Sequence, residues 1–371
     1  MSPWFPDFPL GVEPSEDYNP RPHADTDLFR MPTCSVHPLP YHPNPAEYFS
    51  RVRHAPGAVL LDSGRPSAER GRFDLLSAWP TEQLWVQHDE TGSDFLQRLR
   101  QSLDQLGTAQ LPEEYPLPFA GGLIGYLSYD FGRRLEPLPA HAIDDLQLPD
   151  ARFGVYAWAM ISDHQQGTSQ LVFHPALPDS ERQRLLTLFS QASAADSATF
   201  KLIGAFKADL TERDYRRAFM RIQAYIQSGD CYQVNFSQRF QADCQGDPWA
   251  AYCALRRACP TPFSGYMTLP DNNTVLSLSP ERFVRVSNRQ VETRPIKGTR
   301  PRSKDTTQDA AYAAELLSSP KDRAENLMIV DLLRNDLGRS CKTGSVTVPE
   351  LFSLESYPNV HHLVSSVTGE L

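Results

Sequence analysis

Short apolar runs separated by turns dominate the first half of the chain. They begin at Ala58 and include "AVLLDSG", "RFDLLSAWP" and "EQLWVQH". Runs of this length between turn residues are typical of antiparallel strands. The stretches "FGVYAWAMISD" (153–163) and "TSQLVFH" (168–174) predict a further hairpin. The pattern therefore predicts a first half built mainly from antiparallel strands.

Helical periodicity and helix-end signals appear only later in the chain. "TERDYRRAFMRIQAYIQSGD" places Thr211 and Asp214 in capping-box spacing, repeats apolar residues on one face and stops at Gly229. A second helix is predicted from Ser319 to Gly338, since Pro320 suits a first helical position. Its apolar residues occupy most of the circumference, which predicts a buried helix.

The remaining patterns define regions of the chain. "CYQVNFSQRF" (231–240) alternates strictly and predicts a strand with a polar face, and "TVLSLSPERFVRV" and "RQVETRPI" predict two more. The first thirty residues are rich in proline and acids, and they lack the pattern of a signal peptide. We therefore expect a disordered extension at 1–36, a sheet region at 37–200 and a second region at 201–371.

Composition excludes several classes of protein. With 371 residues, 40% hydrophobic and 22% charged, the chain is an enzyme-sized globular protein. A net charge of −9 argues against a nucleic-acid or anionic-membrane partner, and no apolar run is long enough to span a membrane. The six cysteines are scattered without a CxxC pair, which is typical of a reducing compartment such as the cytoplasm.

Lys297 lies within "TRPIKGTRPR", a stretch with three arginines and no acid. A free lysine is uncharged in only about one molecule in 2,500 at pH 7, so nucleophilic use requires burial or neighbouring cations. Arg294, Arg300 and Arg302 could supply those cations, or could bind a substrate with two carboxylates. The ordinary alternative is a solvated charge run, and the spacing alone favours that alternative.

Glu281 and His362 each have a catalytic and an ordinary interpretation. Glu281 follows a proline in "SLSPERF" and could be a general acid, or it could form a salt bridge to Arg282 or Arg285. His362 in "NVHHLVSSV" could donate a hydrogen bond in a site, although a satisfied core histidine is commoner.

Three carboxylates lie on the predicted buried helix and would require partners there. Glu325, Asp331 and Asp336 could be neutralised by nearby arginines, or one of them could bind a hard cation such as Mg²⁺. Sequence patterns alone leave these two alternatives even.

Taken together, the motifs are far more specific than any one of them. "FAGGLIGYLSYDFGR", "SGDCYQVNFSQRF", "SLSPERF", "PIKGTRPR", "AENLMIVDLLRNDLGR" and "VHHLVSSV" resemble, in order and spacing, the chorismate-utilising enzymes. That family includes anthranilate synthase component I, isochorismate synthase and aminodeoxychorismate synthase component I. The resemblance covers residues 58–371. It implies an α+β fold of two mostly antiparallel sheets packed face to face with outer helices.

The same resemblance implies a helix at "LVSSV", followed by a glycine-rich loop, further strands and a second metal ligand. The chain ends at Leu371, before that part of the pattern. We therefore expect a fold that is incomplete at the C-terminus, with activity of this chain an open question.

The lysine distinguishes members of the family, since "PIKGT" resembles the aminodeoxychorismate synthases and anthranilate synthases have alanine at that position. In those synthases the lysine amine adds to C2 of chorismate as the C4 hydroxyl departs, and ammonia then attacks C4. The resemblance implies that the catalytic residues are Lys297, Glu281 and His362. It implies substrate binding by Arg294, Gly298 and Thr299, and Mg²⁺ binding by Glu325.

Family members also hold L-tryptophan in the N-terminal sheet, as feedback inhibitor or structural ligand. The residues that match are Ser63, Arg70, Gly71, Arg72, Phe73, Pro262, Phe263 and Ser264. Beside them, Asp62 stands where the family has glutamate.

The sequence contains no glutaminase signature, so a glutamine amidotransferase subunit is the expected source of ammonia. Two alternatives remain: anthranilate or isochorismate chemistry, and a catalytically inactive subunit that binds tryptophan.

Overall fold

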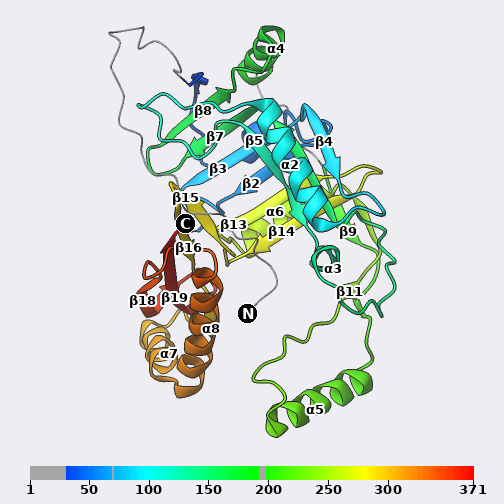
Figure 1. Ribbon diagram of the computed structural model, residues 1–371, viewed down its shortest axis with the longest axis vertical. Coiled ribbons are helices and arrows are strands. Elements are labelled where there is room, and N and C mark those ends of the chain that lie inside the picture. Colours follow the sequence, from blue (N-terminus) through cyan, green and yellow to red (C-terminus); the bar gives the residue numbers. More distant parts are fainter. Residues whose placement is uncertain (1–30, 69–70, 192–197) are drawn as a thin grey trace, which may run out of the picture.

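The computed structural model describes residues 31–68, 71–191 and 198–371 (Figure 1). Most of the predicted extension at 1–36 lies outside the described residues, although Ser35 and Val36 already belong to strand β1. The named strands of the described residues pair antiparallel throughout, and helices other than residues 212–228 lie beside the sheets. The predicted α+β class is thus confirmed.

The largest sheet has seven strands and includes segments from both halves of the chain. Its order is β1 (Ser35–Leu39), β8 (Thr168–Phe173), β7 (Trp158–Asp163), β3 (Phe73–Ser77), β2 (Val59–Asp62), β13 (Phe263–Thr268) and β14 (Thr274–Ser279). The predicted strands at "AVLLDSG" and "RFDLLSAWP" and the predicted hairpin are present. Strand β13 pairs with β2, with Ser264 opposite Asp62, so the regions 37–200 and 201–371 share one sheet.

A three-stranded sheet packs on one side of the large sheet. It contains β4 (Glu82–Trp85), β6 (Ala151–Tyr156) and β5 (Gly122–Leu127), and β6 continues into β7 through Ala157. Ile124 and Tyr156 of the small sheet form one apolar cluster with Val59, Leu75 and Ile161 of the large sheet. Helix α2 (Gly92–Leu106) covers the small sheet through Phe95 and Leu99.

Helices and aromatic side chains form a second core around the large sheet. The helices are α1 (Ala46–Phe49), α4 (Asp179–Ser190) and α6 (Pro248–Ala258). Phe49, Trp249 and Tyr266 make mutual ring contacts, with centroids 5.0–5.6 Å apart. This packing fixes α6 beside the end of β2, where several candidate residues lie.

A five-stranded sheet follows in the second half of the chain. Its strands are β15 (Arg285–Ser287), β16 (Gln290–Thr293), β19 (Val360–Glu370), β17 (Ile296–Pro301) and β18 (Thr347–Ser356), with β19 paired to β16, β17 and β18. Helices α7 (Thr306–Ser318) and α8 (Pro320–Gly338) pack beside it (Figure 1). The remaining short elements are η1 (Tyr129–Phe131), α3 (Gly132–Leu135) and two strand pairs, β9 (Phe200–Leu202) with β12 (Cys244–Gly246) and β10 (Lys207–Ala208) with β11 (Phe240–Gln241).

The helix expected at "LVSSV" is wrong, because residues 360–370 form strand β19. Its neighbours β16, β17 and β18 supply the hydrogen-bond partners that hold it extended. The helix predicted from Ser319 is present as α8, and the Ser319 hydroxyl accepts the Asp322 N–H. Its predicted burial is wrong: Asp322, Asn326 and Val330 are buried, whereas Leu327 and Leu332 are 45% and 53% exposed.

The strand predicted at 231–240 is also wrong, since only Phe240 of that stretch is in a strand. A strand needs a hydrogen-bonded neighbour, and no strand of the described residues pairs with 231–239. The helix before it is confirmed as α5 (Glu212–Ser228), with Thr211 as its N-cap and Gly229 in the left-handed conformation at its end.

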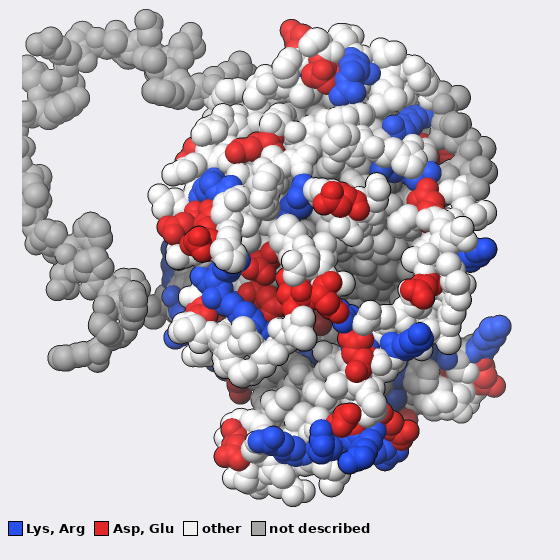
Figure 2. All heavy atoms as spheres, turned by 90° about the vertical axis from the view of Figure 1, so that its right-hand side faces the viewer, with Lys and Arg blue, Asp and Glu red and all other residues white. Residues whose placement is uncertain are grey.

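Helix α5 lies apart from the sheets (Figure 1), and none of its residues is buried. Its surface carries short-range ion pairs, Arg216 with Glu212 and Arg217 with Asp214. Figure 2 views the molecule from the right-hand side of Figure 1 and shows positive and negative side chains interspersed on that face. Within the described ranges, no helix combines the length and apolar character that crossing a membrane requires.

Candidate active site

A cleft of about 800 Å³ lies where residues of the seven-stranded sheet meet residues of the five-stranded sheet. One wall is formed by residues of the predicted tryptophan set. The other wall contains Glu281, Arg294 and Ile296, together with Glu355 and Tyr357. Lys297, Thr299 and His362 do not line this cleft; Lys297 and Thr299 lie within β17, next to Ile296, and His362 lies within β19.

Lys297 occupies an irregular step in strand β17. The pairing of β17 with β19 shifts register between Ile296 and Thr299, which leaves Lys297 and Gly298 in a β-bulge. A bulge re-aims a side chain and is common next to active sites. The Lys297 amine donates to the Ile296 carbonyl at 3.1 Å, and the side chain is half-buried.

Gly298 is required by the geometry of this bulge. Its φ of +88° lies in the left-handed region that favours glycine, and a Cβ there would lie 2.9 Å from Asp322 Cβ and 3.0 Å from Leu316 Cδ1. Helices α7 and α8 therefore pack against β17 through a position where only glycine fits. This contact supports the backbone that carries Lys297.

Glu281 is connected to Lys297 through a shared neighbour, the backbone of Ile296. Its carboxylate Oε1 accepts the Ile296 N–H at 2.9 Å, so Glu281 and Lys297 are both anchored to the peptide groups of Ile296. The alternative salt bridge to Arg282 is not the observed arrangement, because Arg282 pairs with Glu292. Glu281 thus has a defined position beside the candidate nucleophile.

Thr299 and His362 face each other across β17 and β19, with Oγ1 and Nδ1 2.9 Å apart. The imidazole also lies edge-on to the Tyr357 ring, with centroids 5.4 Å apart. Burial lowers the pKa of His362 from its ordinary value, and a backbone hydrogen bond at Gly298 and the charges of Glu355 and Glu281 oppose that change. His362 is therefore neutral at pH 7 and can act as a hydrogen-bond partner without carrying charge.

The three arginines around Lys297 do not form an uncompensated positive cluster. Arg294 Nη2 lies 2.6 Å from Glu355 and 2.9 Å from Glu350. The other two guanidinium groups are also paired, Arg300 with Glu315 and Asp322 and Arg302 with Asp309. The interpretation that free cations surround the lysine is corrected accordingly, because acids from β18, α7 and α8 neutralise the three arginines.

Glu325 lies on the half-buried part of α8, where its Oε1 accepts a hydrogen bond from Gln233 Nε2 at 3.2 Å. In the part of the chain that the structure describes, no group of three or more His, Cys, Asp or Glu side chains could hold a metal ion. Mg²⁺ usually keeps several waters and needs one or two protein carboxylates, and Glu325 fits such an open site.

The residues predicted to bind tryptophan lie together along the first wall. Ser63, Gly71, Arg72, Phe73, Pro262, Phe263 and Ser264 all line the cleft. Arg70 lies outside the described residues. The Arg72 guanidinium is 4.6 Å from the centre of the Phe73 ring and pairs with Asp163 at 2.7 Å.

Two buried carboxylates, Asp62 and Asp74, support this wall. Their network of hydrogen bonds was not predicted from the sequence. Asp62 accepts hydrogen bonds from Arg256 Nε at 2.6 Å and from the Tyr252 hydroxyl at 2.8 Å. Asp74 accepts the Ser63 N–H at 2.8 Å and the Ser63 hydroxyl at 2.7 Å, and it pairs with buried His164 at 2.7 Å. The sequence signal that could have indicated this network is that Asp62 and Asp74 lie within predicted strands of otherwise apolar residues.

Comparison with known proteins agrees with this geometry. The sequence profile described as chorismate binding enzyme matches residues 57–371. Aminodeoxychorismate synthase component 1 of Klebsiella aerogenes is 46% identical over 346 residues, which cover 90% of this chain and 75% of that protein. The protein of the same name from Escherichia coli is 44% identical, with 87% of this chain and 72% of the relative covered.

Among solved structures, anthranilate synthase component I from Streptococcus pneumoniae superposes with a TM-score of 0.68 at 28% identity, covering 81% of this chain and 69% of that chain. At position 297, this chain has the lysine that the sequence pattern singled out.

Proposed function

Because the chain belongs to the chorismate binding enzyme family, we propose that it converts chorismate and ammonia to 4-amino-4-deoxychorismate. The observation that carries the proposal is Lys297 in the bulge of β17, with Glu281 anchored to the preceding residue. Relatives of 44–46% identity bear the name of that synthase. Formation of anthranilate or isochorismate is the alternative that the lysine disfavours.

In the first step, the Lys297 amine forms a bond to C2 of chorismate as the C4–O bond breaks. The ring double bonds shift between these carbons, and the hydroxyl leaves as water after receiving a proton from Glu281. Hydroxide is a poor leaving group, so a positioned acid is required. The amine loses its own proton to solvent or to a nearby base, which leaves lysine covalently attached to C2.

In the second step, ammonia forms a bond to C4 and the C2–N bond to Lys297 breaks. The double bonds return, and the departing lysine nitrogen takes up a proton. The net reaction replaces the C4 hydroxyl by an amino group and releases water. Covalent catalysis of this kind divides one difficult displacement into two easier steps.

Substrate orientation is assigned to the residues around the bulge. Thr299 and His362 form a hydrogen-bonded pair, and we assign this pair to the C4 side of the substrate, where a neutral imidazole would contact the departing hydroxyl. Gly298 is assigned an indirect role, because it lets α7 and α8 pack against the backbone that carries Lys297. Arg294 would bind a substrate carboxylate, which requires it to exchange contacts with Glu350 or Glu355.

We assign Mg²⁺ as the cofactor and Glu325 as one of its ligands. When bound, the ion would neutralise the ring carboxylate of chorismate. The oxygen donor at Glu325 and the neighbouring Gln233 amide suit a hard, partly hydrated cation.

The proposal extends to partners and location. The component 1 designation of the relatives implies a second subunit, which we propose to be a glutamine amidotransferase that delivers ammonia. L-Tryptophan is the proposed ligand of the wall around Ser63 and Phe73. We assign the protein to the cytoplasm and treat 37–200 and 201–371 as its tryptophan-side and chorismate-side regions.

The test combines the chain with chorismate, Mg²⁺, ammonium and excess aminodeoxychorismate lyase, and measures 4-aminobenzoate. Lys297→Ala should abolish the product, whereas Lys304→Ala, which alters an exposed lysine seven positions later, should retain it. Intact-mass analysis should detect chorismate minus one water on the wild type and none on Lys297→Ala. Anthranilate or isochorismate as the main wild-type product, or unchanged product from Lys297→Ala, would refute the proposal.

A further inference from the structure

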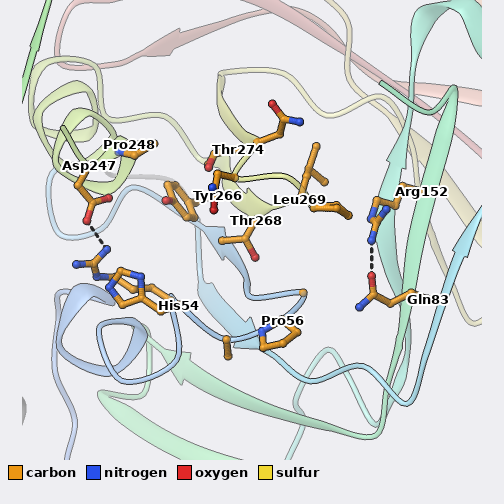
Figure 3. Close-up of a pocket in the computed structure, with 16 residues that line it drawn as sticks. His54, Pro56, Gln83, Arg152, Asp247, Pro248, Tyr266, Thr268, Leu269 and Thr274 are labelled. Carbon is orange, nitrogen blue, oxygen red and sulfur yellow. Dashed lines mark hydrogen bonds and ion pairs between the residues drawn. The ribbon is translucent and has the colours of Figure 1, made fainter. Parts of the chain in front are cut away.

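A second cavity, of about 550 Å³, lies away from the candidate active site (Figure 3). Its lining comes from the loop after α1, the turn between β13 and β14, the start of α6, and strands β4 and β6. None of the residues assigned above to chorismate, Mg²⁺ or tryptophan lines it. A volume between 300 and 1,000 Å³ is typical of pockets for small molecules.

Arg152 of β6 is the distinctive side chain of this cavity. Its guanidinium donates a hydrogen bond to the Gln83 side chain and lies 5.7 Å from the centre of the Trp85 ring. Both contacts are with neutral residues, and Asp271 acts on Arg152 only through space. Burial lowers the pKa of Arg152 from its ordinary value. The Arg152 guanidinium is thus partly removed from water, and neither of the two contacts above is with a carboxylate.

Such an arrangement has a free-energy cost that an anion would reduce. A partly desolvated cation loses hydration, and a carboxylate or phosphate oxygen restores strong, charge-assisted hydrogen bonds. A guanidinium carries five N–H donors, and the single hydrogen bond to Gln83 leaves donors for a ligand. The Trp85 ring, within cation–π range, and the Gln83 amide orient the guanidinium, which reduces the side-chain entropy lost on binding.

The opposite side of the cavity carries an ion pair whose charges cancel, so it adds no net charge. Figure 3 shows Asp247 joined to its guanidinium partner on the side across from Arg152 and Gln83. That partner, Arg53, lies 2.6 Å from Asp247. Although burial alone would raise the pKa of Asp247, the Trp249 amide and Arg53 hold it below its ordinary value, so the pair stays ionised.

Two guanidinium groups against one carboxylate give the lining a net charge of +1 with His54 neutral. The amides of Asn272 and Asn273 at the hairpin turn add neutral donors and acceptors, and Leu269 and Pro56 add apolar surface. A few polar groups on a partly apolar wall are the usual composition of a ligand site.

We propose that this cavity binds a small oxyanion, a carboxylate or phosphate group of a metabolite-sized molecule, through Arg152, Gln83 and the hairpin amides. The site is distinct from the chorismate site and does not depend on the function proposed above. A neighbouring hollow of about 680 Å³ shares Arg152, Gln83 and Pro270, so a longer ligand can extend past the guanidinium.

The test is a fluorescence titration of the full chain at pH 7.5, because Trp85 contacts Arg152 and reports on its surroundings. Sodium phosphate and sodium succinate are added separately, with sodium chloride at matched ionic strength as the control. We expect a saturable change in tryptophan emission with phosphate, succinate or both, and no such change with chloride. Trp85→Phe should remove the change in signal and thereby identify the reporter.

Arg152→Gln should weaken binding at least tenfold, which is the loss expected for one charge-assisted hydrogen bond. Arg184→Gln is the matched control, since Arg184 also stacks on a tryptophan, 4.1 Å from the Trp79 ring centre, but pairs with Glu181. It should bind like the wild type. If Arg152→Gln fails to fold by circular dichroism, Arg152→Lys replaces it and should also bind at least tenfold more weakly.

A response to phosphate alone assigns a phosphate site, and a response to succinate alone assigns a carboxylate site. Equal affinity in wild type and Arg152→Gln, or a response to both salts no greater than that to chloride, would overturn the inference. Formation of 4-aminobenzoate with ammonium should be the same in Arg152→Gln and wild type.

Discussion

The sharpest stability prediction concerns Arg256, which neutralises a carboxylate beneath the cleft wall. The Asp62 side chain is fully buried, and the Arg256 side chain is 12% exposed. Arg256 donates to both oxygens of Asp62, at 2.6 and 3.0 Å, and also to the Arg65 carbonyl. Arg256→Met keeps most of the side-chain volume and removes every one of these donors.

The magnitude follows from what remains after the substitution. Removing one partner of a buried ion pair costs about 3–5 kcal/mol, because the other charge is left without compensation. The Tyr252 hydroxyl, 2.8 Å from Asp62, and the Gly64 N–H, at 2.7 Å, stay in place and favour the lower part of that range. We therefore expect Arg256→Met to lower the free energy of unfolding by about 3 kcal/mol.

Urea unfolding followed by circular dichroism measures this loss. The control is Arg184→Met, which breaks a pair whose side chains are 43% and 44% exposed and should cost less than about 1 kcal/mol. Asp62→Asn combined with Arg256→Met removes both charges and should recover at least half of the loss. The reasoning fails if Arg256→Met is no less stable than Arg184→Met, or if the double variant is less stable than the single one.

Three further predictions concern β17 and its neighbours. Gly298→Ala should destabilise by about 1–3 kcal/mol in urea unfolding and by more than Gly344→Ala, because both positions have positive φ but only at Gly298 would the new Cβ clash, 2.9 Å from Asp322 Cβ. Burial lowers the pKa of His362 in the folded state from its ordinary value of 6.5. As the pH drops below about 6.5, the unfolded chain therefore binds this proton more readily than the folded one, and the free energy of unfolding should fall. His362→Gln should flatten that dependence, and an unchanged pH profile would contradict it. Glu325→Gln should reduce the rise in melting temperature that Mg²⁺ produces with chorismate present, and an equal rise in both proteins would exclude Glu325 as a ligand.

Local patterns predicted those elements whose signals are local. The caps at Thr211 and Ser319 mark the starts of α5 and α8, because each hydroxyl accepts an N–H three residues ahead. The strands around Leu60 and Leu76 followed from short apolar runs between turns. The grouping of Glu281, Lys297, Thr299 and His362 rested on family resemblance, since spacing alone favoured ordinary interpretations.

The misses depend on partners distant in sequence. Residues 231–239 alternate as a strand does, yet alternation cannot supply the neighbouring backbone that a strand requires. Residues 360–370 became a strand because three neighbours pair with it. The acids that neutralise Arg294 come from β18, more than fifty residues later in the sequence, and no local pattern indicates such pairing.

The pairing of β13 with β2 has a consequence for synthesis on the ribosome. Asp62 pairs with the strand of Ser264, which emerges some 200 residues later. At roughly 5–20 residues per second, the edge of β2 stays open for about 10–40 s in each nascent chain. An open strand edge is a template for joining other chains. A chaperone that covers the β2 edge during that interval should therefore protect the nascent chain from such joining.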